Sequence, residues 1–100
     1  MIQRIVLIKL TDDHATPANR RTLVEHTQAV LTALPGVRNV TVGTPSDDKS
    51  QQSWDVGITL HFDDMESLEQ YRVHPTHRRY VDEFLKPQMA VIKAWNFEVT

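Results

Sequence analysis

The stretch Ile2-Gln3-Arg4-Ile5-Val6-Leu7-Ile8-Lys9-Leu10 decides the fold of this chain. It is short and rich in β-branched residues, which predicts a β-strand. Most of its even positions are apolar, and so are Ile5 and Leu7 on the opposite side. A strand that is apolar on both faces is buried on both sides. A chain of 100 residues has helices enough to cover one face of its sheet, so we expect the other face to need a partner.

The rest of the chain alternates between strand and helix patterns. Strand patterns cover 37–43, 54–62 and 91–99, and helical patterns run over about 17–34, from 65 to a break at Pro75, and from Pro75 to Pro87. The segment 44–53 is polar and predicts an exposed hairpin loop. The order βαββαβ, with right-handed crossovers, predicts an α+β, ferredoxin-like fold. Its four-stranded antiparallel sheet would have strand order 4-1-3-2, with the helices on one face.

Residues that start and stop helices support these limits. Thr16 is a candidate N-cap and Pro17 fits the first helical turn. Pro35 disfavours helical geometry in the residue before it, which ends the first helix. Asp63 and Asp64 are the candidate N-caps of the next helix.

The composition excludes several classes of protein. The net charge of −2 gives no reason to expect nucleic acid or an anionic membrane as a partner. The absence of cysteine excludes disulfides and thiolate metal sites. No apolar run approaches the ~20 residues that a membrane span needs, and no signal peptide precedes the first strand. We therefore expect one cytoplasmic domain over residues 1–100.

The stretch Tyr71-Arg72-Val73-His74-Pro75-Thr76-His77 is the one cluster suited to proton chemistry. Because imidazole titrates near neutral pH, His77 is a candidate general base, with Tyr71 positioning or polarising a substrate carbonyl. In the alternative interpretation His77 hydrogen-bonds locally and Tyr71 is an aromatic residue at the edge of the core. His74 precedes a proline at a helix start, where its side chain is expected to cap or brace the junction.

Several landmarks together resemble the stress-responsive A/B barrel domain (Dabb) family of dimeric α+β barrels. They are the opening Ile-Val-Leu-Ile-Lys strand, Leu34-Pro35-Gly36-Val37, Phe62-Asp63, and Tyr71 to His77 as Y-x-x-H-P-x-H. The resemblance implies a homodimer in which two sheets pack face to face around a two-fold axis. Ile5 and Leu7 would then lie at the contact with the second subunit.

The resemblance also implies a reaction and a site. One relative, a plant polyketide cyclase, closes a linear polyketide by aldol condensation without a cofactor. The tyrosine and the last histidine of its motif act in acid–base catalysis, and these positions are Tyr71 and His77 here. Two further histidines in the cavity of that cyclase correspond to Arg4 and Val56, so this chain departs from it there. The residues expected to line a ligand pocket are Arg4, Val56, Ile58 and Tyr80.

No cofactor and no functional metal are expected, because the histidines lack the H-x-x-x-H pairing of a helical site. Some relatives carry a magnesium-like ion on backbone carbonyls that correspond to Leu31, Leu34 and Val37, and such a structural cation stays an open alternative here. Arg78 and Arg79 are placed to attract an anionic or carboxylate-bearing ligand to the pocket mouth, or else form a solvated helix face.

Three function classes follow from the sequence. The first is a hydrophobic pocket for a small carbonyl or aromatic ligand, with cofactor-independent cyclase- or lyase-type proton transfer by His77 and Tyr71. The second is a non-enzymatic stress-response or interaction protein whose dimer is the functional unit. The third, which few features favour, is a haem-degrading or quinol-oxidising monooxygenase on the same barrel fold. The expected partners are a second copy and a small hydrophobic molecule, with neither nucleic acid nor membrane.

Overall fold

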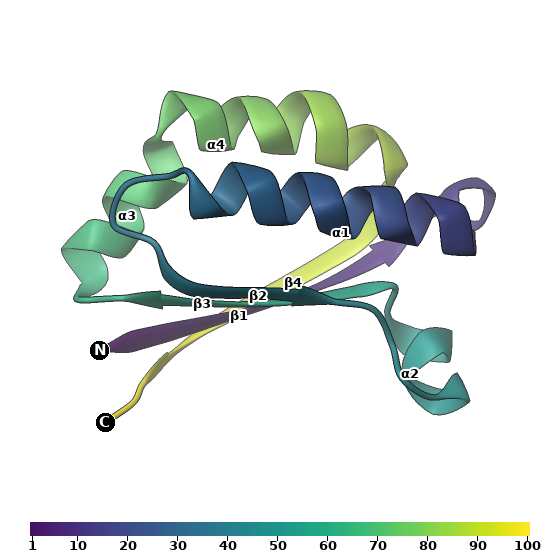
Figure 1. Ribbon diagram of the computed structural model, residues 1–100, viewed down its shortest axis with the longest axis horizontal. Helices are drawn as coiled ribbons and strands as arrows, with labels where there is room; N and C mark the ends of the chain where they lie inside the picture. Colours follow the sequence, from purple (N-terminus) through teal and green to yellow (C-terminus); the bar gives the residue numbers. More distant parts are fainter.

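The computed structural model describes residues 1–100 as one antiparallel sheet with helices on one face (Figure 1). Its elements are β1 (Ile2–Leu10), η1 (Asp12–His14), α1 (Pro17–Thr32), β2 (Arg38–Gly43), α2 (Asp48–Ser53), β3 (Val56–Phe62), α3 (Met65–Val73), α4 (Pro75–Arg79), η2 (Tyr80–Leu85), η3 (Lys86–Gln88) and β4 (Met89–Glu98). This order confirms the βαββαβ plan. None of the helices has the length and apolar character that a membrane span requires.

The strands lie in the order β2-β3-β1-β4, and all neighbours are antiparallel. This is the predicted order, read from the other edge. In the register of the sheet, Ile5 lies opposite Thr59 on one side and Trp95 on the other. Residues that lie directly opposite each other point to the same face. The odd positions of β1 therefore share a face with the odd positions of β3 and β4.

The even positions of the two central strands form the core under the helices. β3 alternates without exception between buried even positions and half-buried odd ones. Ile8 of β1, Leu60 of β3 and Leu23 of α1 are completely buried. The amphipathic pattern thus places one face of the sheet against α1, α3 and α4, as Figure 1 shows.

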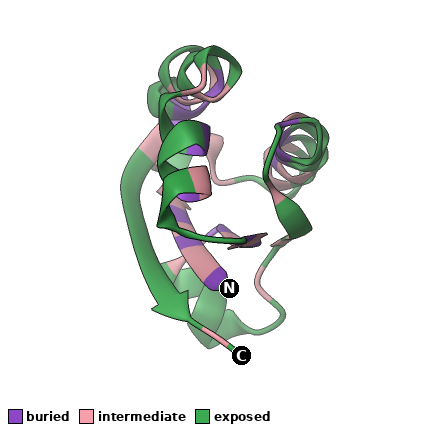
Figure 2. Cartoon of the chain, turned by 90° about the vertical axis from the view of Figure 1, so that its left-hand side faces the viewer, coloured by how far each residue is buried: buried purple, intermediate pink, exposed green.

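None of the long helices covers the opposite face of the sheet, where only the short α2 lies near the β2–β3 end, and the apolar residues of this face remain partly accessible (Figure 1). Ile5 and Leu7 are half-buried, whereas Trp95 and Phe97 are 47% and 51% exposed. In Figure 2 the strand β4 has the exposed colour along nearly its whole length. This is the face for which the sequence predicts a partner.

The segment 44–53 is not entirely loop, so that prediction is wrong for Asp48–Ser53, which forms α2. The Asp47 side chain accepts a hydrogen bond from the Ser50 N–H at 2.7 Å and caps this helix. Trp54 ends α2, and therefore β3 begins at Val56 and not at Trp54. A helix without any apolar residue leaves no periodic signal, which is why the pattern missed it.

The helical limits near prolines differ from the predictions by small shifts. α1 starts as predicted, with Thr16 capping the Asn19 N–H at 3.1 Å, and ends at Thr32. α3 starts at Met65, and its N-cap is Asp64, whose side chain accepts from the Ser67 N–H at 2.8 Å. Of the two aspartates proposed as caps, Asp64 is therefore the one that serves.

The helix break at Pro75 lies where the sequence predicts it. His74 has extended backbone between α3 and α4, and its Nδ1 accepts the Thr76 N–H at 3.1 Å. The capping role expected for His74 is thus present. Beyond α4 the chain widens into the π-helix η2 (Tyr80–Leu85). Such widened turns are rare and occur often at functional sites.

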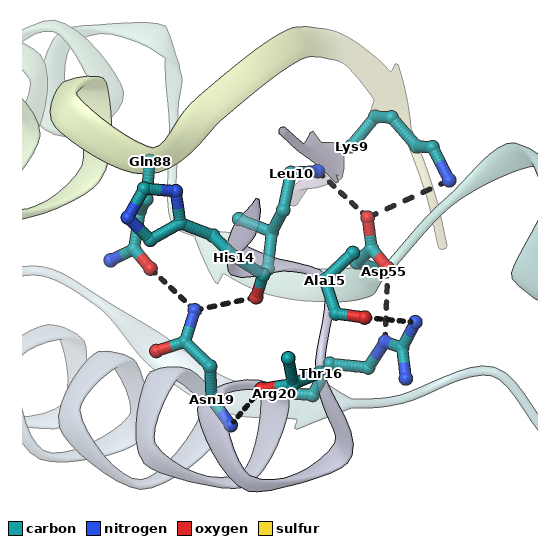
Figure 3. Close-up of polar contacts among 9 residues, drawn as sticks. All are labelled: Lys9, Leu10, His14, Ala15, Thr16, Asn19, Arg20, Asp55 and Gln88. Carbon is teal, nitrogen blue, oxygen red and sulfur yellow. Dashed lines mark hydrogen bonds and ion pairs between the residues drawn. The ribbon is translucent and has the colours of Figure 1, made fainter. Parts of the chain in front are cut away.

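A buried carboxylate fastens the end of the sheet where β1 meets α1 (Figure 3). Asp55 is completely buried, and its Oδ2 accepts the Leu10 N–H at 2.7 Å. Its Oδ1 accepts from Arg20 Nε at 2.9 Å, and Lys9 Nζ lies 3.8 Å from Oδ2. The carboxylate thereby joins β1, α1 and the start of β3.

A second group of hydrogen bonds extends this cluster toward β4 (Figure 3). Asn19 Nδ2 donates to the His14 carbonyl and to Gln88 Oε1, both at 2.8 Å. The Gln88 carbonyl in turn accepts the Thr11 N–H at 3.0 Å. The polar cluster therefore holds the loop after β1 against the turn before β4.

Candidate functional site

A cavity of about 220 Å³ lies between the sheet and the helices near the Pro75 break. Its floor consists of Arg4, Val6 and Ile8 of β1, Ile58 of β3 and Ile92 of β4, and its roof of Leu31, Tyr71, Arg72, Val73, His77, Arg78, Tyr80, Val81 and Leu85. The lining is mostly apolar with a few polar groups, which is the usual composition of a small-molecule site. Two of the roof residues are Tyr71 and His77.

A larger hollow of about 540 Å³ lies at the other end of the molecule, beside Arg20, Arg21 and Gln51. Only two of its nine lining residues are hydrophobic. Arg20 is already paired with Asp55. With no histidine or tyrosine in its lining, this hollow offers no acid–base pair, and the smaller apolar cavity is the better candidate site.

The Pro75 break brings Tyr71 and His77 together, although they belong to different helices. Their ring centroids lie 4.2 Å apart with 42° between the ring planes. Tyr71 also packs against Phe62 of β3, with the centroids 5.0 Å apart. The tyrosine ring is therefore held between the sheet and His77, and its position is fixed by packing on both sides.

The tautomer of His77 follows from its hydrogen bond. Nδ1 lies 3.1 Å from the Arg72 backbone carbonyl oxygen, which can only accept. Nδ1 therefore carries the proton, and in neutral imidazole the lone pair lies on Nε2. Burial lowers the pKa of His77, and the neighbouring cations Arg4, Arg78 and Arg72 act in the same direction. His77 is thus a neutral base at pH 7.

Two tyrosines reach the cavity, and only one hydroxyl is already used. The Tyr80 hydroxyl is hydrogen-bonded to Oγ1 of Thr27, which is completely buried on α1. The Tyr71 hydroxyl has no hydrogen-bond partner in the protein, and no fully buried side-chain polar atom lacks one. The Tyr71 hydroxyl must therefore reach open space, and the cavity is the space that Tyr71 lines. Burial raises the pKa of Tyr71, so the phenol stays protonated and can donate.

Arg4 supplies a positive charge to the same cavity. It lies on the helix-covered face of β1, where the other even positions are buried and apolar. Its Nη1 donates to Asn96 Oδ1 on β4 at 2.9 Å. Burial lowers the pKa of Arg4, which nevertheless remains a cation at neutral pH. The positive charge of Arg4 lowers the pKa of Tyr71 and so partly opposes the rise that burial causes.

The structure brings most of the residues expected at the site together. Tyr71, His77, Arg4, Ile58 and Tyr80 all line the cavity. Val56 does not, although Ile58 two residues further along β3 does; Val56 instead lines a separate hollow beside Trp54 and Gly57.

Other lining residues were not anticipated from the sequence. Leu31, Leu85 and Ile92 complete the apolar wall, and Asn96 holds Arg4. The contact between Asn96 and Arg4 could have been predicted from the sequence, because the two residues lie opposite each other in the antiparallel register of β1 and β4. For the residues of the apolar wall, the sequence offers no predictive feature beyond hydrophobic periodicity.

Comparison with known proteins identifies the family. The protein-family model described as Stress responsive A/B Barrel Domain matches residues 2–99 of this chain. The chain belongs to this family. A search of curated protein sequences finds no significant match.

Solved structures of several family-like proteins share the ferredoxin-like fold. A Dabb family protein from Mesorhizobium loti is 20% identical, with a TM-score of 0.80 over 99% of this chain and 96% of that one. A protein from Thermobifida fusca, described as a dimeric ferredoxin-like protein of unknown function, is 21% identical, with a TM-score of 0.81 over 98% and 90%. A hydroxynitrile lyase from Passiflora edulis is 13% identical, with a TM-score of 0.78 over 99% and 93%. Identities this low establish the common fold alone.

Proposed function

We propose that this protein is a homodimeric A/B barrel whose cavity binds a small carbonyl or aromatic compound and catalyses cofactor-independent proton transfer on it. One observation carries the proposal. A neutral histidine with a free Nε2 and a tyrosine with an unused hydroxyl meet at one mostly apolar cavity. Base and hydrogen-bond donor are the two groups that enolisation of a carbonyl compound requires.

In the proposed step, His77 Nε2 removes a proton from the carbon next to the substrate carbonyl. The C–H bond breaks, an N–H bond forms, and the electron pair moves through the new C=C bond onto the carbonyl oxygen. The Tyr71 hydroxyl donates a hydrogen bond to that oxygen, and the charge of Arg4 stabilises the negative charge that develops there. The enolate then attacks a second carbonyl, as in a cyclase, or takes the proton back from His77.

The cavity limits the size of the ligand. An apolar cavity of roughly 150 Å³ accommodates benzene. At about 220 Å³, this cavity suits one aromatic ring with a short substituent. The proposed ligand is therefore of about that size.

The homodimer is part of the proposal because the open sheet face is apolar. Ile5 and Leu7 lie beside Trp95 and Phe97 on that face, and all four are at least partly accessible. Two such faces would bury each other around a two-fold axis. The relative from Thermobifida fusca is described as dimeric. Light scattering at micromolar concentration is expected to give twice the 11.5 kDa chain mass, whereas a clean monomer would refute this part.

The catalytic part can be tested by hydrogen exchange on acetophenone, whose methyl group lies next to a carbonyl on a single ring. Incubation in D₂O followed by ¹H NMR measures the loss of the methyl signal. We expect the protein to accelerate this exchange. His77→Gln should reduce the acceleration by roughly 100-fold or more, which is typical for loss of a general base. Tyr71→Phe should reduce it by a similar factor, since it removes the donor to the enolate oxygen.

His74→Gln is the matched control, because His74 belongs to the same motif but serves the helix junction. It should retain the exchange rate of the unaltered protein. Equal rates in the His77→Gln and His74→Gln variants would refute the catalytic proposal. No exchange by an intact dimer would favour the non-enzymatic alternative, in which the dimer itself is the functional unit.

A further inference from the structure

The charged residues around the cavity are all of one sign. Arg4, Arg72 and Arg78 line it, together with the neutral His77, and no aspartate or glutamate does. Arg72 is neutralised by Glu69, with 2.9 Å between Arg72 Nη1 and Glu69 Oε1. Neither Arg4 nor Arg78 forms an ion pair with any carboxylate of the protein. The cavity therefore holds two positive charges that no carboxylate pairs with directly, although Glu69 acts on Arg4 and Asp82 on Arg78 from a longer distance.

Arg4 is the more informative of the two because of its surroundings. It lies on β1 between Ile2 and Val6, both buried on the same face. Its one hydrogen bond within the protein goes to the neutral amide of Asn96. A guanidinium has five N–H donors, so four remain for other partners. A half-buried cation in an apolar cavity is costly unless it is paired.

We propose that the cavity selects anionic ligands, namely small aromatic or β-keto carboxylates, and that Arg4 binds their carboxylate. The inference rests on the proposed function in that it takes this cavity as the ligand pocket, and it adds the substrate class. The planar fork of arginine matches the two oxygens of a carboxylate and forms paired hydrogen bonds with them. Arg78, on the roof, provides the second positive charge.

The positions of the polar groups suit such a ligand. Arg4 is on the sheet, and Tyr71 and His77 are on the helices above it. With the carboxylate of a β-keto acid on Arg4, its keto group would lie toward the Tyr71 hydroxyl, and the carbon between the carboxylate and the keto group is the acidic one. The apolar remainder of the ligand then occupies the space beside Ile58 and Leu85.

Binding of benzoate and of its neutral isostere benzamide tests this inference. The two probes have the same shape and differ in charge. Isothermal titration calorimetry is expected to give tighter binding for benzoate. Arg4→Gln should weaken benzoate binding by about tenfold or more, the usual effect of losing a charged hydrogen-bond pair, and should weaken benzamide binding by less, since the amide oxygen loses only a hydrogen bond and no charge pair. Arg4→Lys keeps the positive charge but loses the planar fork of arginine, so its affinity for benzoate should lie between those of the unaltered protein and Arg4→Gln.

Arg79→Gln is the matched control, because Arg79 follows Arg78 directly on α4 but does not line the cavity. It should bind benzoate as the unaltered protein does. The inference is overturned if benzoate binds no tighter than benzamide, if neither binds, or if Arg4→Gln and Arg79→Gln weaken benzoate equally. Circular dichroism verifies that each variant is folded. If Arg4→Gln is not folded, the benzoate affinity of Arg4→Lys is compared with that of the unaltered protein instead.

The two proposals fail in different ways. If His77→Gln binds benzoate normally and neither acetophenone nor its carboxylate-bearing analogue 4-acetylbenzoate shows enzymatic exchange, the catalytic proposal fails and the carboxylate site stands. If exchange depends on His77 while benzoate shows no preference over benzamide, the carboxylate site fails and the catalytic proposal stands.

Discussion

Replacing Asp55 by asparagine is expected to be the most destabilising conservative change in this protein. The carboxylate is completely buried and accepts from the Leu10 N–H and from Arg20 Nε. Asparagine has nearly the same shape and keeps one acceptor for Leu10. Its amide nitrogen, however, would face Arg20 Nε, and both are donors. The substitution therefore removes the counter-charge of a guanidinium whose side chain is only 12% exposed.

The size of the effect follows from burial. Removing one partner of a buried ion pair costs about 3–5 kcal/mol, because the other charge stays buried without compensation. A domain has roughly 5–15 kcal/mol of total stability, so this loss is a large part of it. With about 4–8 °C of midpoint shift per kcal/mol, the melting temperature should fall by roughly 12–40 °C. Arg20→Met should cost less, since Leu10 and Lys9 still face the carboxylate.

Asp63→Asn is the matched control. Asp63 pairs with Arg38 at 3.0 Å, but both side chains are more than half exposed. An exposed pair of this kind contributes about 0–1 kcal/mol. Urea unfolding followed by circular dichroism, at one fixed protein concentration, measures all variants. If Asp55→Asn costs no more than Asp63→Asn, or if the losses of Asp55→Asn and Arg20→Met simply add in the double variant, the polar cluster does not fasten the fold as argued.

Three further predictions follow from single contacts. Tyr80→Phe should lose about 1–3 kcal/mol of stability because it leaves a buried hydroxyl on α1 unpaired, whereas Tyr71→Phe should be nearly neutral in the same unfolding experiment. In an NMR titration, the pKa of His77 should lie below the usual value of about 6.5. The unfolded state then binds more protons than the folded state, so stability should fall as the pH drops below about 6.5 toward the folded-state pKa. The His77→Gln variant should show less of this pH dependence. Thr16→Ala should cost about 1 kcal/mol by removing the cap of α1, while Thr22→Ala, an exposed change inside the same helix, should cost nothing measurable; equal losses would contradict the capping role.

The fold could be predicted because the pattern of apolar and polar residues in each strand indicates which of its faces are buried. The alternation in β3 and the apolar stretch of β1 identify the core face and the second apolar face. Residues near the helix ends add Thr16, Asp64 and Pro75 as boundaries, and all three hold. Strand order then follows from connection rules. Nothing beyond local pattern and topology is needed for these features.

Features that depend on tertiary contacts could not be predicted in the same way. Asp55 is one polar residue at the start of a strand, and only the folded chain brings Leu10 and Arg20 to it. The π-helix η2 has the same apolar spacing as an ordinary helical turn, so the sequence gives no sign of it. α2 did have a signal, since Asp47 stands three residues before Ser50, the arrangement of an N-cap.

The candidate site, too, could be predicted from the sequence only in part. Tyr71 and His77 lie six residues apart across a proline, and their meeting depends on how α4 turns back after the break. The motif suggested the pair, but the free tyrosine hydroxyl and the fixed histidine tautomer come from the three-dimensional contacts. Val56 was misplaced because strand alternation gives the face of a residue and not its distance along the cavity.

Arg4 connects the sequence, the fold and the proposed function. It is the one charged residue on the inward face of β1, where local pattern calls for an apolar side chain. Breaks of this kind in an otherwise consistent sequence are expected at functional sites. In the folded protein the guanidinium is not in the packed core; it lines the cavity, held by Asn96 from the neighbouring strand and lacking a carboxylate partner. A purely structural role would favour a hydrophobic residue at this position, so the presence of a charge here favours a ligand that supplies the missing anion.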